Sequence, residues 1–115
     1  MKVGGKGLEE VTLTIPQSTS LYFEVIHKDE QGHTVDHSLS VAHMAFQTYD
    51  KKTSYDLSQY VTCSATKIAI NLPASLSLPL GNMLWDLIVE TVSGGVVRLC
   101  YGSVSIVDTY SLDGE

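Results

Sequence analysis

Residues 83–90 decide the fold, and they read Met-Leu-Trp-Asp-Leu-Ile-Val-Glu. The odd-numbered positions are all large and apolar: Met83, Trp85, Leu87 and Val89. A period of two residues places these side chains on one face of a β-strand and the intervening ones on the other. The pattern therefore predicts an amphipathic strand with Trp85 in the core of the protein.

The same alternation continues on both sides of this stretch. Ile68, Ile70 and Leu72 alternate with smaller or polar residues, and residues 96–107 form a further strand-like run after the turn at residues 93–95. Residues 72–81 combine two prolines and a glycine with four leucines. We expect this segment to be a connection across one end of the core, which its leucines fill. The three runs predict paired antiparallel strands.

The amino-terminal half contains three more strand-like runs, at residues 11–16, 21–27 and 40–48. In the last of these, the alternation places Ala42, Met44 and Phe46 toward the core. Residues 55–63 have no clean period, so a short strand, a helical turn and an irregular crossover all remain open. No segment has a convincing helical period.

These patterns predict an all-β fold, a single immunoglobulin-like antiparallel β-sandwich of seven or eight strands. We expect a flexible amino-terminal arm over residues 1–10, because residues 1–7 are rich in glycine and lysine. The sandwich domain spans residues 11–110, and residues 111–115 are a carboxy-terminal tail. A chain of 115 residues is long enough to bury its own core.

The charge of the chain excludes some partners. A formal net charge of −6 with only seven basic residues argues against nucleic-acid binding, which needs clustered lysine and arginine. No apolar run is long enough to cross a membrane, and residues 1–10 lack the apolar segment of a secretory signal, so we expect synthesis in a cytoplasm.

Two cysteines, Cys63 and Cys100, lie in strand-like segments beside apolar neighbours. In a reducing compartment, both are expected to be small buried hydrophobic residues, with a disulfide across the sandwich or a metal site as the alternatives.

We find no constellation that predicts catalysis, a metal or a cofactor. The four histidines, His27, His33, His37 and His43, are close in sequence but lack the spacing of a metal site, and we expect them to be solvated loop residues. The carboxylates form no recognisable acid and base pair, and no serine occupies a nucleophile elbow. The sequence thus predicts a protein that is not an enzyme and that works through its surface.

The candidate interaction residues come from the arm and from tyrosines. A loose arm can dock on neighbours, and an exposed tyrosine is a good interface anchor. The residues that we expect to make such contacts are Met1, Lys2, Val3, Lys6, Leu8, Tyr49 and Tyr110.

The order of segments resembles a small β-sandwich family of tailed bacteriophages, which includes the amino-terminal domain of baseplate upper proteins. In the first half, the matching positions are residues 11–20, 21–27, 29–32, 34–36 and 42–47. In the second half, they are residues 68–72, 76–80, 81–90, 93–95 and 102–107. The family's usual arginine near the end of the middle strand is replaced here by Gln47-Thr48.

The resemblance implies a bacteriophage virion structural protein, a non-catalytic adaptor in the tail or baseplate that attaches fibres. Its partners would be other virion proteins, in a symmetric multimer within the particle, and neither nucleic acid nor a membrane. Because no coiled coil or receptor-binding domain follows Asp113, we expect a stand-alone virion subunit made in the host cytoplasm. A capsid decoration protein that stabilises the head is one alternative, and a carbohydrate-binding module for host attachment is another.

Overall fold

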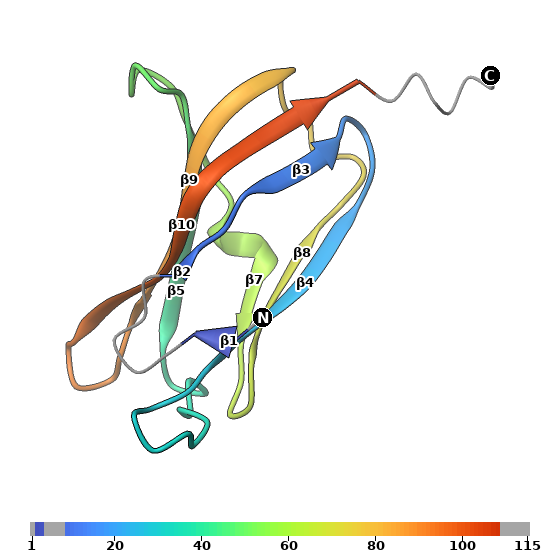
Figure 1. Ribbon diagram of the computed structural model, residues 1–115. Helices are drawn as coiled ribbons and strands as arrows, with labels where there is room; N and C mark the ends of the chain where they lie inside the picture. Colours follow the sequence, from blue (N-terminus) through green and yellow to red (C-terminus); the bar gives the residue numbers. More distant parts are fainter. Residues whose placement is uncertain (1, 4–8, 109–115) are drawn as a thin grey trace.

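Two β-sheets face each other across one apolar core (Figure 1). This computed structural model describes residues 2–3 and 9–108. The smaller sheet has the strand order β1 (Lys2–Val3), β4 (Leu21–His27), β8 (Ile68–Leu72) and β7 (Val61–Cys63). The larger sheet has the order β2 (Glu9–Glu10), β10 (Val96–Val107), β9 (Gly81–Glu90), β5 (Val41–Gln47) and β6 (Ser54–Asp56), and β3 (Leu13–Pro16) also pairs with β10.

The predicted all-β class is confirmed, and so is the alternation along the central strands. In β9, the four odd-numbered residues of the predicted inner face are buried, and Trp85 is only 3% exposed. Met44 and Phe46 of β5 are buried as expected, and so are Ile68, Ile70 and Leu72 of β8. A two-residue period was therefore sufficient to assign the inward faces of these strands.

The connection between β8 and β9 fits the prediction except at its end. Leu72 and Leu78 are buried, and Leu76 packs against the core. The expectation was wrong for Leu80, which lies directly before the first residue of β9 and is 54% exposed. The segment left open in the sequence contains the end of β6, a short 3-10 helix (Ser58–Tyr60) and β7. Since β6 and β7 belong to different sheets, this segment is a crossover between the layers.

The structure differs from the expected strand pairing in two respects. The described residues form ten strands rather than seven or eight, since several are only two or three residues long. The pairing is not purely antiparallel, because β2 and β3 run parallel to β10 and β1 runs parallel to β4. Two parts of the expected flexible arm, Lys2–Val3 and Glu9–Glu10, thus have backbone partners in the sheets.

A β-bulge in β10 lets two consecutive residues face the core. The register between β10 and β9 shifts between Arg98 and Cys100, and both Leu99 and Cys100 are fully buried. An extra residue in one strand breaks the alternation locally, so neighbours no longer point to opposite faces.

Cys63 and Cys100 are both free, and burial raises the pKa of the Cys100 thiol to about 12.

A close contact joins the first strands to the last ones. The Val11 backbone N–H donates to the Tyr101 carbonyl at 2.8 Å, and the Trp85 indole N–H donates to the Val11 carbonyl at 2.9 Å. Gly102 lies opposite Trp85 in the neighbouring strand, and a Cβ atom there would overlap the Val11 carbonyl oxygen. The absence of a side chain at residue 102 therefore lets the chain between β2 and β3 approach β10.

Candidate functional site

Four exposed aliphatic side chains surround one end of the larger sheet. Val41 of β5 and Val96 of β10 both lie opposite Glu90 of β9. Directly opposite residues have Cβ atoms roughly 5 Å apart on the same face, so the two valines flank Glu90. Leu39 precedes β5 by two residues, and Val92 lies in the turn between β9 and β10. We call these four residues the tip patch: Leu39, Val41, Val92 and Val96.

The exposure of the tip patch is large for aliphatic side chains. The four residues are between 57% and 78% exposed. The β9–β10 turn and the loop before β5 both lie at the lower end of the sheets in Figure 1. Single exposed apolar residues are ordinary, whereas several that gather on one surface mark a contact site for another protein. The tip patch has the composition of a protein-docking surface.

A polar pair lies among these aliphatic residues. The His43 Nε2 atom is 2.7 Å from a Glu90 carboxylate oxygen, and both side chains are about half exposed. An exposed pair of this kind contributes little to stability. At a docking surface, it supplies a hydrogen-bonding group within an otherwise apolar area.

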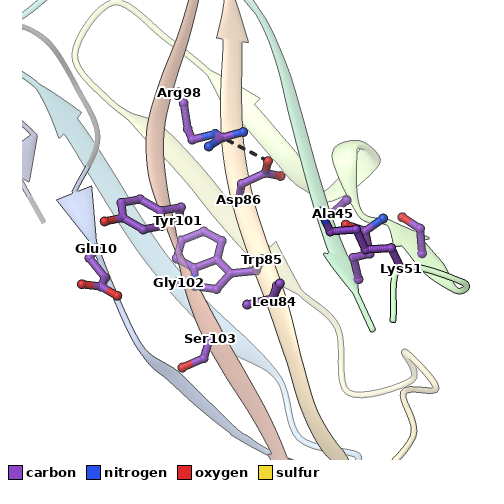
Figure 2. Close-up of a pocket in the computed structure, with 12 residues that line it drawn as sticks. Glu10, Ala45, Lys51, Leu84, Trp85, Asp86, Arg98, Tyr101, Gly102 and Ser103 are labelled. Atoms are coloured by element: carbon purple, nitrogen blue, oxygen red, sulfur yellow. Dashed lines mark ion pairs between the residues drawn. The ribbon is translucent and has the colours of Figure 1, made fainter. Parts of the chain in front are cut away.

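A second feature of the larger sheet is a groove of about 540 Å³ on its outer face (Figure 2). Two rows of opposite residues cross the sheet here. One row joins Tyr101, Asp86 and Ala45, and the other joins Ser103, Leu84 and Gln47. The groove extends from Glu10 at the β2 side to Lys51, in the loop between β5 and β6.

The groove contains one ion pair between described residues. The Arg98 Nε atom lies 3.8 Å from an Asp86 carboxylate oxygen, and Figure 2 shows this pair above Tyr101. Because both side chains are partly exposed, the pair orients the arginine more than it stabilises the fold. The groove thus has a polar wall with charges of both signs.

The expectation that the histidines are solvated was wrong for His27 and His37. Their rings stack with centroids 5.2 Å apart, the His27 Nδ1 and His37 Nε2 atoms are 3.0 Å apart, and both residues are buried. His37 is also 2.9 Å from the Ser40 hydroxyl. Burial, with a smaller contribution from His27, lowers the pKa of His37 and so favours its neutral form. The sequence did not indicate this pair, since His37 lies outside any strand.

The predicted interaction residues fall into three groups. Tyr49 is 57% exposed in the turn between β5 and β6. Lys2 and Val3 form β1, where their backbone lies beside Ile26 and His27 of β4. The remaining four lie outside the described residues: Met1, Lys6, Leu8 and Tyr110. The sequence reasoning missed the tip patch and the groove, because both depend on which strands become neighbours.

Several described acidic side chains make contacts that stabilise turns. Several aspartates accept hydrogen bonds in turns, and these bonds lower the pKa values of Asp29, Asp36, Asp50 and Asp56. Within residues 2–3 and 9–108, there is no group of three or more histidine, cysteine or acidic residues placed to hold a metal ion. In the same part of the chain, no helix is long and apolar enough to span a membrane.

In comparisons with known proteins, the sequence matches no protein-family model, and no curated protein is significantly similar to it.

Proposed function

We propose that this chain is a structural subunit of a bacteriophage particle, a non-catalytic adaptor of the tail or baseplate that attaches fibres to it. The observation that carries the proposal is the tip patch, where Val41 and Val96 flank Glu90 and, like Leu39 and Val92, are exposed. Protein interfaces of this kind are built around apolar side chains with polar groups at their rim. Here the polar groups are His43 and Glu90, and Glu90 lies between the two valines rather than at the rim.

The strand edges support docking through side chains rather than through strand addition. The edge strands are all short: β1 and β2 have two residues each, β6 and β7 have three each, and β3 has four. Short edge strands leave few free backbone groups for a neighbouring chain to pair with. A partner would therefore gain more from burying the tip patch than from extending either sheet.

We also propose a fold class for the two sheets and a location for the protein. We assign the sandwich to the immunoglobulin-like class, which fits its two facing sheets of mainly antiparallel strands. The subunit is made in the host cytoplasm and joins other virion proteins, in copies set by the symmetry of the particle. The excess of acidic residues is consistent with protein partners rather than packaged nucleic acid.

The test is to image purified particles with a gold-labelled antibody raised against this chain. The adaptor proposal predicts label at the tail end of each particle. Label spread over the head would reject the adaptor and favour a capsid decoration protein. Two negative results together would overturn a structural role: no label on intact particles, and no reaction of the antibody with the denatured proteins of those particles.

A further inference from the structure

The shape of the groove follows from the lengths of its side chains. Ala45 and Ser103 are short and leave space above the sheet, while Glu10 and Lys51 stand at opposite sides (Figure 2). Its volume of about 540 Å³ lies within the roughly 300–1,000 Å³ that small-molecule sites occupy. The groove is open to solvent, so a ligand longer than one ring can extend beyond it.

Several polar groups in the groove are available to a ligand. Gln47, Lys51, Tyr101 and Ser103 make no side-chain hydrogen bond or ion pair with the described part of the chain. Together they offer an amide, an ammonium group and two hydroxyls, and therefore both donors and acceptors. A ligand that itself carries donors and acceptors would satisfy them best.

The charge of the groove is balanced. Glu10 and Asp86 are acidic, whereas Lys51 and Arg98 are basic. The lining therefore has no net preference for an anion or a cation. A phosphate-rich or strongly basic polymer gains no net electrostatic attraction from this groove.

A peptide is also a poor match for this location. Extended peptides bind at sheet edges, where free backbone groups can pair with them. The groove lies instead over β9 and β10, whose backbone groups are used within the sheet by neighbours on both sides.

We propose that the groove binds a neutral carbohydrate, a short oligosaccharide without acidic groups. Sugar hydroxyls both donate and accept hydrogen bonds, which matches Gln47, Asp86, Arg98 and Ser103. The apolar C–H face of a sugar ring packs on an aromatic ring, and Tyr101 supplies one at the groove. This binding activity is independent of the adaptor role, because the groove and the tip patch share no residue.

The test begins with the purified full-length chain on a printed array that carries neutral, sialylated and sulfated glycans. The strongest neutral glycan is then titrated into the ¹⁵N-labelled protein and followed by NMR. We expect binding to neutral glycans, with shift changes at β9 and β10 residues of the groove. Tyr101→Ala should weaken binding about tenfold, because stacking on the ring is lost.

Matched variants separate the groove from the rest of the surface. Tyr22→Ala removes an exposed tyrosine on β4 of the other sheet and should leave the affinity unchanged. Gln47→Ala removes a polar group without any described hydrogen bond, and it should weaken binding even if Tyr101→Ala fails to fold. A flat array, binding to acidic glycans only, or affinity that neither Tyr101→Ala nor Gln47→Ala changes would overturn the proposal.

Discussion

Replacing Trp85 with alanine should destabilise the protein by ~3–5 kcal/mol, the usual cost of truncating a large buried aromatic residue. The indole is 3% exposed and meets the Phe23 ring edge-on at 6.1 Å. It also donates the hydrogen bond to the Val11 carbonyl. A domain of this size has a total stability of roughly 6–17 kcal/mol, so the variant loses a large fraction of it.

The loss at Trp85 can be divided between packing and hydrogen bonding. Trp85→Phe keeps an aromatic ring but removes the indole donor, so it should cost about 1–3 kcal/mol. The control is Leu84→Ala on the outer face of the same strand, which should cost less than about 1 kcal/mol.

The assay is urea unfolding, monitored by far-ultraviolet circular dichroism because that backbone signal does not depend on Trp85. Thermal unfolding is the second measurement. For Trp85→Ala, we expect the melting temperature to fall by more than about 10 °C. If Trp85→Ala and Leu84→Ala destabilise the protein equally, Trp85 is not a core residue and the assigned faces of β9 are wrong.

Three other predictions follow from the fold. Gly102→Ala should lower stability by more than about 2 kcal/mol, because the new methyl group overlaps the Val11 carbonyl; an unchanged urea midpoint would contradict the close approach. Because the pKa of His37 is lowered in the fold, the unfolded chain binds its proton more readily, so the free energy of unfolding should fall as the pH drops below about 6.5. His37→Gln should flatten that decline between about pH 7 and pH 5 in urea titrations, and an equally steep decline would show that other groups cause it. The Cys100 thiol, with its pKa of about 12, should react with iodoacetamide only after unfolding, as peptide mass spectrometry can measure; rapid labelling of the native protein would contradict its burial.

The sequence was sufficient to predict the inward faces of β5, β8 and β9. The alternation through Trp85 and through Phe46 depends only on neighbouring residues, and a period of two residues has one structural meaning. The same information does not say which strands become neighbours or in which direction they run. The parallel pairing of β3 with β10 brings together residues 13–16 and 104–107, and no local pattern encodes that contact.

The candidate surfaces were harder to predict for the same reason. Val41 and Val96 become neighbours of Glu90 only when β5 and β10 pair with β9 on either side. The groove likewise requires side chains from neighbouring strands to share one face. The bulge at Leu99 also escaped prediction, since an extra residue interrupts the period from which faces are assigned.

The buried histidine pair shows a different limit of sequence reasoning. His27 ends β4, whereas His37 belongs to an irregular loop whose path is set by hydrogen bonds, including one from the His37 N–H to the Ser64 carbonyl. Polar composition alone suggested a solvated loop, but a long-range backbone contact buries it.

The central claim is that the tip patch attaches this subunit to another protein of the particle. The most direct measurement is incorporation of tagged copies into particles during infection, quantified by immunoblotting of purified particles. Wild-type protein and Leu80→Asp, a change at an exposed leucine outside the patch, should enter particles equally well, whereas Val96→Asp should be excluded while remaining folded by circular dichroism. Equal incorporation of all three proteins would contradict the claim.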